Sequence, residues 1–355
     1  MGTATSVERR TVVGCVDRAR SVPSRRARVL VAIAIGEICG VLAWATQFAG
    51  RTDWAQIWYG ARALMDGISP YSVVGPGRIF EWQFPLLYPL PAILVGVPFS
   101  FAPLAVAVGL FAGCSAALLS FALTRASWHR LLLLLAAPFV LAMLSAQWSP
   151  ILTAAVLLPP LGFLFVAKPT VGAALWLYKP SRSAVMGGAS LLLASLAVRP
   201  SWPQEWLATL SQTGHMVVPL MHAGGPLLLL ALLRWRRPEA RLLLALACVP
   251  QTALLYEMVP LMLIPSSLGE SAVFVALTYI VFGWWAHLRP YATVAESIVS
   301  SIHIVVPLLY LPCLIMILQR RNEGDVPDWI ERWASRALLE IRQRLRGSVL
   351  QKRRR

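Results

Sequence analysis

Asp53 is the residue whose setting best suits it for chemistry. It comes just after a long apolar stretch, and Trp54 and Trp58 follow it in the chain. A carboxylate that aromatic rings partly remove from water has a raised pKa, which makes it a better proton acceptor at neutral pH. Asp53 is therefore a candidate general base. The sequence also allows a plainer role, in which Asp53 only caps a helix that begins at Trp54.

Glu257 is the second candidate for a catalytic role. It lies within an apolar segment, where an ionisable side chain indicates a functional position. Two interpretations stay open: a second active-site group, or a residue at the watery tip of a short arm. The chain has no Walker lysine motif, no HExxH and no GxSxG. ATP-driven and metallohydrolase functions are therefore not indicated, and no metal site or cofactor is predicted.

The composition indicates what kind of protein must position these acids. Of the 355 residues, 57% are hydrophobic and 14% charged, against about 25% charged in ordinary soluble domains. Several apolar runs approach or reach the roughly 20 residues that cross a bilayer. The net charge of +16 lies mainly in short loops and both tails, as membrane topology requires. We predict an all-α polytopic membrane protein that does not bind nucleic acid.

The apolar runs predict about ten membrane crossings. The first, residues 29–49, follows a basic segment, so the N-terminus is expected in the cytoplasm and the loop 50–86 outside. The run 88–101 contains three prolines and is predicted to be a re-entrant segment or a short hairpin arm. The remaining crossings are expected at 103–124, 131–145, 149–167, 184–198, 216–233, 241–254, 256–268, 271–288 and 299–319. This topology places Lys168 and the segment after it on the cytoplasmic side.

Two basic tails flank the transmembrane domain predicted at 29–319. Residues 1–28 are expected to be a cytoplasmic tail, and residues 320–355 a second one. In the second tail Trp329, Trp333 and Ala337 recur every four residues, with arginines on the opposite face. This pattern is typical of a helix that lies on an anionic membrane surface, although a helix that docks a partner protein would look similar.

The first outer loop carries a recognisable order of residues. It reads DWAQIWYGARALMDGISPY from Asp53 to Tyr71, and Phe84, Tyr88 and Pro89 follow. This order resembles the first-loop signature of glycosyltransferase family 87, the polyprenol-phosphate-mannose-dependent mannosyltransferases of the GT-C superfamily.

Two later segments agree with the resemblance. Ser145-Ala146-Gln147 is similar to a small-x-Gln turn of that family, and Lys168-Pro169 is similar to its Lys-Pro element. The sequence departs from the family at Tyr256-Glu257, which stands where a histidine motif is expected. A non-catalytic assembly protein and a secondary transporter or flippase therefore remain as alternatives.

The resemblance implies an inverting sugar transfer on the outer face of a bacterial inner membrane. The donor would be a lipid-linked sugar on a polyprenyl phosphate, and Asp53 would take a proton from the acceptor hydroxyl. Cationic residues would bind the phosphate, with Arg51, Arg62, Arg78 and Arg199 as outer choices, and Trp148 or Trp202 would be further sugar platforms. The substrate-binding residues implied are Arg51, Trp54, Arg62, Tyr71, Trp82, Tyr88, Gln147 and Lys168. Membrane lipids are the other expected partners.

Overall fold

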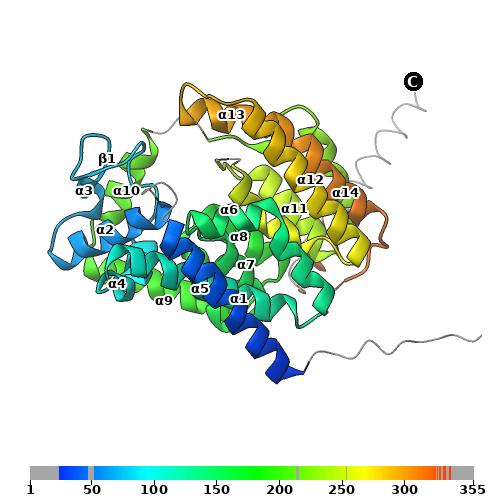
Figure 1. Ribbon diagram of the computed structural model, residues 1–355. Coiled ribbons are helices and arrows are strands. Elements are labelled where there is room, and N and C mark those ends of the chain that lie inside the picture. Colours follow the sequence, from blue (N-terminus) through cyan, green and yellow to red (C-terminus); the bar gives the residue numbers. More distant parts are fainter. Residues whose placement is uncertain are drawn as a thin grey trace, which may run out of the picture.

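The computed structural model describes residues 24–46, 52–212, 216–252 and 254–324, with five further residues up to position 336. This part of the chain is mostly helical (Figure 1). Its strands are β1 (Val74–Gly75) and β2 (Phe80–Glu81), which pair in parallel within the first outer loop. The predicted all-α class is confirmed at this level.

Four helical segments are long and apolar enough to cross a membrane. They are α1 (Arg25–Thr46), α5 (Leu104–Leu123), α12 (Leu268–His287) and the continuous stretch Ala295–Leu318, which comprises most of α13 (Val294–Val305), η7 (Val306–Tyr310) and α14 (Leu311–Leu318). Two bent pairs raise the number to six: α6 (Ala137–Leu144) with α7 (Ser149–Leu157), and α9 (Arg182–Val198) with α10 (Trp202–Leu210). The chain thus has the helices of an integral membrane protein, in four to six spans within the described residues.

Shorter elements occupy several of the other predicted crossings. The arms at 241–254 and 256–268 correspond to α11 (Pro238–Cys248) and to the 3-10 helix η6 (Leu255–Leu263). The remaining short elements are α3 (Pro70–Val73), α4 (Leu90–Ser100), η2 (Trp128–Leu135), η3 (Pro159–Ala167), α8 (Pro169–Tyr178), η4 (Pro219–Met221) and η5 (Gly225–Arg234). At 1.5 Å per residue, α11 extends about 16 Å, which is half of a bilayer core.

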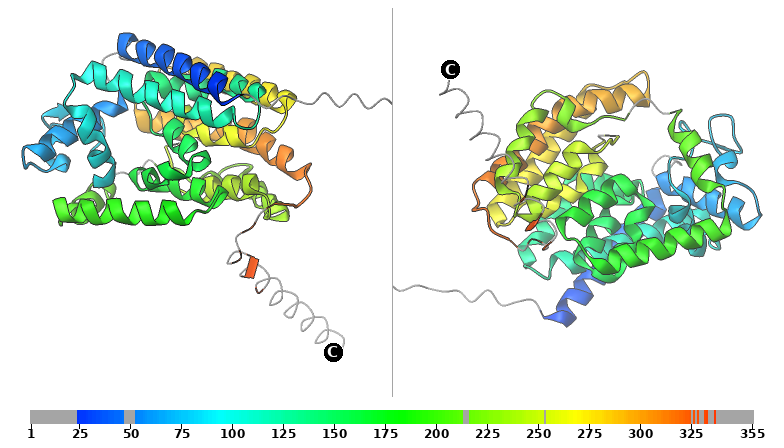
Figure 2. Two further views of the ribbon diagram at one scale, coloured as in Figure 1. Left: turned by 90° about the horizontal axis from the view of Figure 1, so that it is seen from below. Right: turned by 180° about the vertical axis from the view of Figure 1, so that it is seen from behind.

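Glycines bring α1 and α5 into direct contact along one side of the bundle, and α9 lies along the opposite side (Figure 2). A Cβ atom added to Gly40 would lie 2.9 Å from the carbonyl oxygen of Gly109, and one added to Gly113 would lie 2.9 Å from that of Gly36. Small residues at these positions therefore let two backbones approach closely. This pairing fixes the end of α1, after which the chain enters the first outer loop.

The first outer loop contains the predicted amphipathic helix. Helix α2 (Asp53–Met65) buries Trp54, Ile57 and Ala61, and Gly96 of α4 lies directly against Ile57. The N-cap of α2 is Thr52, and it forms no side-chain capping hydrogen bond. The interpretation of Asp53 as a simple helix cap is therefore wrong, because its carboxylate binds elsewhere.

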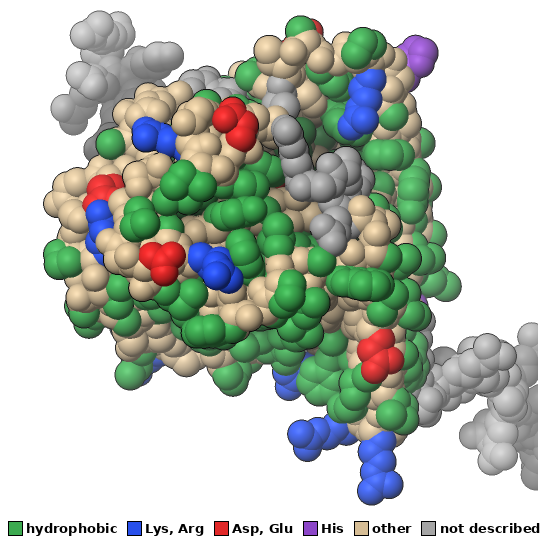
Figure 3. All heavy atoms as spheres, turned by 60° about the vertical axis from the view of Figure 1, so that its left-hand side comes forward, with side chains coloured by type: hydrophobic (Ala, Val, Ile, Leu, Met, Phe, Trp, Pro, Cys, Tyr) green, Lys and Arg blue, Asp and Glu red, His purple; other side chains and the backbone are tan. Residues whose placement is uncertain are grey.

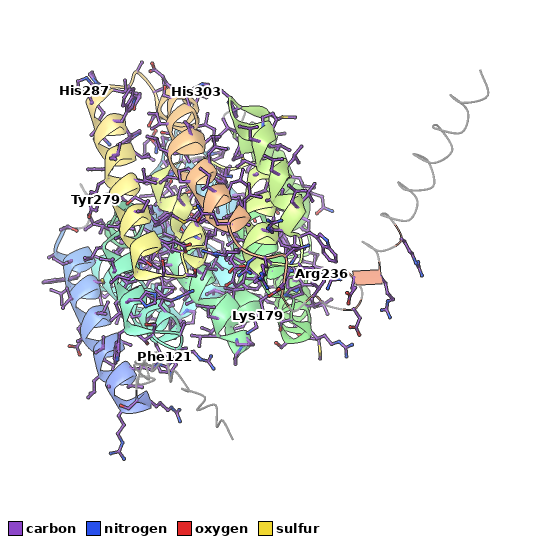
Figure 4. The ribbon with its side chains drawn as sticks, turned by 90° about the vertical axis from the view of Figure 1, so that its right-hand side faces the viewer. Phe121, Lys179, Arg236, Tyr279, His287 and His303 are labelled. Carbon is purple, nitrogen blue, oxygen red and sulfur yellow. The ribbon has the colours of Figure 1, made fainter. Side chains whose placement is uncertain are left out.

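Charged residues gather toward one end of the bundle. Phe121 and Lys179 lie at this end, and His287 and His303 lie at the opposite one (Figure 4). On the face shown in Figure 3, single acidic and basic side chains are scattered among hydrophobic ones, and basic side chains gather at the lower end, where α1 begins.

The first residues of the C-terminal tail pack against the helical bundle. The Arg234 guanidinium donates to the Arg320 carbonyl, and the Arg236 backbone amide donates to Asn322 at 3.0 Å. The boundary predicted at residue 320 thus lies within packed structure. The apolar stripe from Trp329 onward lies outside the described residues.

Candidate functional site

A cavity of about 240 Å³ lies between the start of α2 and the segments before α4, α8 and η6. Its wall is mainly apolar, with a few polar groups, as in most small-molecule sites. The polar and aromatic side chains that line it are Asp53, Gln56, Trp82, Gln83, Phe84, Tyr88, Lys168, Thr170, Trp206, Gln251, Thr252, Tyr256 and Glu257.

Asp53 lies in the first turn of α2 and lines this cavity. Its backbone amide donates to the carbonyl of Ser145 at 3.2 Å, and the Gln147 side-chain amide donates to its carboxylate. Burial raises the pKa of Asp53 above its ordinary value; the Gln147 hydrogen bond and Lys168 act against this shift, and Glu257 adds to it. A carboxylate with a raised pKa is suited to accept a proton near neutral pH.

Lys168 and Glu257 form an ion pair on the same cavity. The Lys168 ammonium lies 2.5 Å from Glu257 Oε1, and the Thr252 hydroxyl donates to that oxygen at 3.3 Å. Glu257 is only 4% exposed, and its Oε2 has no hydrogen-bond partner among the described residues. The interpretation of Glu257 as a residue at a watery tip is therefore wrong, because it lies buried beside Asp53.

Lys168 and Asp53 line one cavity, so the predicted placement of these two residues on opposite sides of the membrane is wrong. Helices α6 and α7 have eight and nine residues and are bent by 116° at the turn between them. Neither is long enough to cross a bilayer alone, and after the short element η3 the chain lies at the cavity again at Lys168. Helix α8 then runs from the cavity to Lys179, at the bundle end shown in Figure 4.

Aromatic rings surround the charged groups. Tyr88 lies beneath the Lys168 ammonium, 6.0 Å from ring centroid to nitrogen, and Trp82 and Tyr256 complete this part of the wall. Burial, with Asp53 and Glu257 nearby, raises the pKa of both Tyr88 and Tyr256. Their phenol groups stay protonated at neutral pH and can donate hydrogen bonds.

Helix α10 fixes the backbone that carries Tyr88. The Trp206 indole donates to the Leu87 carbonyl at 2.9 Å, and the Thr209 hydroxyl donates to the Leu86 carbonyl at 3.2 Å. Tyr71 also contributes here, because its hydroxyl donates to the Tyr88 carbonyl at 3.3 Å. Tyr71 itself does not line the cavity, so it supports a wall residue and is not placed to bind substrate.

Two residues of α2 that the resemblance implied for binding lie elsewhere. Trp54 is fully buried and stacks on Phe111, with ring centroids 3.6 Å apart. Arg62 donates to the Ser100 carbonyl at 3.4 Å and lies over Trp58. Nine helical positions separate Arg62 from Asp53, and at about 100° per residue this puts it on the opposite face. Neither residue lines the cavity, so this geometry does not support a substrate-binding role for Trp54 or Arg62.

Arg78, Arg199 and Trp148 do not line the cavity either. Arg199 pairs with Glu205 at 2.9 Å, and Arg78 is exposed to solvent. Trp148 is buried in the core beside Trp54. Arg51 lies outside the described residues. Among the described lining residues, Lys168 is the one cation at this cavity.

The sequence reasoning missed several lining residues. Gln56 follows Asp53 by three positions on α2, a spacing that places two side chains on one helical face, so this signal was available. The sequence carries no such signal for Thr252, because its contact with Glu257 depends on how the chain folds between α11 and η6. Within the described residues no group of three or more His, Cys, Asp or Glu side chains comes together as a metal site.

An apolar groove of about 510 Å³ adjoins the cavity and runs between α8 and α9. Pro89, Pro169 and Trp206 line both spaces, so the groove and the cavity share part of one wall. Gly172, Ala173, Val185, Gly188 and Leu192 form much of the rest of its wall. A long apolar chain could therefore lie in the groove with its polar head in the cavity.

No protein-family model, no curated protein and no solved structure matches the chain.

Proposed function

We propose that the protein transfers a sugar from a polyprenyl-phosphate donor to an acceptor hydroxyl, as a glycosyltransferase of the GT-C type. The observation that carries the proposal is the position of Asp53. Asp53 lines a cavity that has one cation among its described lining residues and that adjoins an apolar groove. A base, a phosphate-binding group and a lipid channel are the three parts that such a transfer needs.

In the proposed reaction Asp53 removes the proton from the acceptor hydroxyl as that oxygen attacks the anomeric carbon of the donor. The bond between that carbon and the phosphate oxygen breaks, and the polyprenyl phosphate leaves with the electron pair, so the configuration inverts. The Lys168 ammonium would stabilise the charge on the leaving phosphate. Glu257, paired with Lys168 at 2.5 Å, would hold the ammonium toward the cavity. Trp82 and Tyr88 would contact the sugar.

The orientation in the membrane is part of the proposal. Helix α1 has 22 residues and extends about 33 Å, which matches a bilayer core. It begins at the arginine-rich end of the bundle, and Asp53 follows its other end. The preference for basic residues on the cytoplasmic side favours an inner-membrane protein with cytoplasmic termini and an outward-facing site.

The test compares Asp53→Asn with the wild-type protein in lipid vesicles. Polyprenyl-phosphate mannose is the donor, and labelled sugar transferred to membrane lipid or glycan acceptors is measured. We expect a loss of about 10²- to 10⁴-fold in rate, the usual contribution of a general base. Asp66→Asn is the matched control, because Asp66 ends the same helix and is exposed. Equal rates in Asp53→Asn and wild type would refute the assignment.

A lipid carrier or flippase is the second candidate. The two bent helix pairs favour it, because broken helices line the substrate paths of many transporters. Movement of a labelled polyprenyl-phosphate sugar across vesicles, without any transfer of the sugar, would support this function over the first.

A further inference from the structure

The turn between α6 and α7 contacts Asp53 through both its backbone and a side chain. The Ser145 carbonyl accepts from the Asp53 backbone amide at 3.2 Å, and the Gln147 amide nitrogen donates to Asp53 Oδ2. Because an ionised carboxylate only accepts hydrogen bonds, the Gln147 amide must present its nitrogen here. The other carboxylate oxygen, Oδ1, is then left for a substrate proton.

The turn is built to hold Gln147 in this place. Ala146 has φ of 50°, a left-handed conformation that residues other than glycine rarely adopt. The Gln147 backbone amide donates to the Ala142 carbonyl at 2.8 Å, and Trp148 packs against both rings of the stacked pair Trp54 and Phe111. Uncommon backbone conformations often occur at functional sites, where the surrounding structure enforces them.

Gln147 itself cannot reach a substrate. It is 1% exposed and does not line the cavity, in contrast to the substrate-binding role that the resemblance implied. We propose that Gln147 is a positioning residue, which fixes the Asp53 carboxylate so that Oδ1 faces the acceptor hydroxyl. The proposal rests on the proposed function for the identity of the reaction, but the contact between the two side chains does not depend on it.

The electrostatic consequence of this contact can be measured. The Gln147 hydrogen bond lowers the pKa of Asp53 against the raising effects of burial and Glu257, and Lys168 also lowers it. Tyr88 and Tyr256 are the other titratable groups near Asp53. Without the amide donor, the pKa of Asp53 rises further, so a higher pH is needed to ionise it.

The first experiment measures thermal unfolding against pH and needs no substrate. Because folding raises the pKa of Asp53, the stability that this group contributes is full below the ordinary aspartate pKa of about 4 and is lost as pH rises through the raised value. We expect Gln147→Leu to move this loss to higher pH, and Asp53→Asn to remove it in both backgrounds. Gln212→Leu, at an exposed position after α10, should leave it unchanged.

The second experiment measures the pH profile of sugar transfer. Gln147→Leu should lower kcat by up to about 100-fold, as for a displaced catalytic group, with KM little changed and the acidic limb moved to higher pH. Gln147→Asn has a shorter amide that cannot reach Asp53, and it replaces Gln147→Leu in both experiments if that variant does not fold. An unfolding profile that does not move in either variant overturns the positioning role. Absence of transfer by the wild-type protein would instead contradict the proposed function alone.

Discussion

Two clusters of charged side chains in this protein differ in their surroundings and in their balance of positive and negative charge. The first, the cavity cluster, consists of Asp53, Lys168 and Glu257, and all three line the cavity. It has two carboxylates and one ammonium. The second, the bundle-end cluster, has two carboxylates and two guanidinium groups and does not line that cavity. Its members are Arg237, Glu239, Glu270 and Arg320.

The bundle-end cluster is matched charge for charge. Arg320 lies 3.2 Å from Glu239 and 2.5 Å from Glu270, and Arg237 lies 3.4 Å from Glu239. The cavity cluster has one ammonium for two carboxylates, and this ammonium, on Lys168, is already paired with Glu257. The charges that join helices at the bundle end are thus matched in number, whereas the cavity cluster has one acid in excess beside an open space.

The largest expected effect separates the two clusters by stability. Arg320→Met leaves Glu270 without its cation and Glu239 with Arg237 alone, and breaking a fully buried pair costs about 3–5 kcal/mol, which is the upper bound for these partly buried groups. We expect thermal unfolding in detergent at a clearly lower temperature, with the transfer rate per folded molecule unchanged. Arg125→Met, at an exposed arginine, is the control and should change stability by less than about 0.5 kcal/mol. A stable Arg320→Met protein that has lost sugar transfer would contradict the comparison, because Arg320 would then matter for the reaction and not for stability.

Lys168→Met should show the opposite pattern. Loss of the one described cation at the cavity removes charge stabilisation from the leaving phosphate, and removal of such a group typically costs about 10²- to 10³-fold in rate. The pKa of Asp53 would also rise, since Lys168 lowers it. Initial rates at saturating donor measure the effect, with Lys179→Met at the far end of α8 as the control. Full activity in Lys168→Met would exclude the phosphate-binding role.

Glu257→Gln is expected to have a smaller effect, of about tenfold on the rate, because Lys168 would lose the partner that orients it. Glu257→Gln should also shift the pH profile of the rate, and the direction of this shift is predicted. The Glu257 carboxylate raises the pKa of Asp53, so its removal should move the acidic limb of the rate profile to lower pH. Glu81→Gln, at an exposed acid of the same outer loop, should leave the profile in place. A shift toward higher pH would contradict the arrangement of charges.

The smallest expected effect concerns the groove beside the cavity. Val185 lines the groove and is 54% exposed, so Val185→Trp fills part of it. We expect a severalfold rise in KM for a long-chain polyprenyl donor and little change for a short-chain analogue. Met186→Trp, on the adjacent position outside the groove, controls for added bulk. Equal changes for both donors would show that the lipid chain lies elsewhere.

The sequence predicted local features well and distant contacts poorly. Helix α2, the span α5 and the position of Asp53 after α1 all follow from apolar periodicity and loop charge. The pairing of Lys168 with Glu257 joins residues 89 positions apart, and without a fold no pattern indicates it.

Short apolar runs account for the difference in the number of spans. A run of 10–15 apolar residues fits a short crossing, a re-entrant arm or a buried helix, and hydropathy alone does not separate these. The structure resolves α6, α7, α11 and η6 as short pieces within the bundle. Likewise, the apolar pattern of α2 identified an amphipathic helix but did not show that Trp54 faces the core and Asp53 the cavity.

The most direct test of the central claim is the initial rate of sugar transfer as a function of pH, measured in parallel for the wild-type protein and Asp53→Asn. A base that must be ionised and whose pKa is raised by burial predicts a wild-type rate that increases with pH, with a midpoint above the ordinary aspartate value of about 4. Asp53→Asn should show a low residual rate without this ionisation. The same rising profile in both proteins would contradict the account, because the titrating group would not be Asp53.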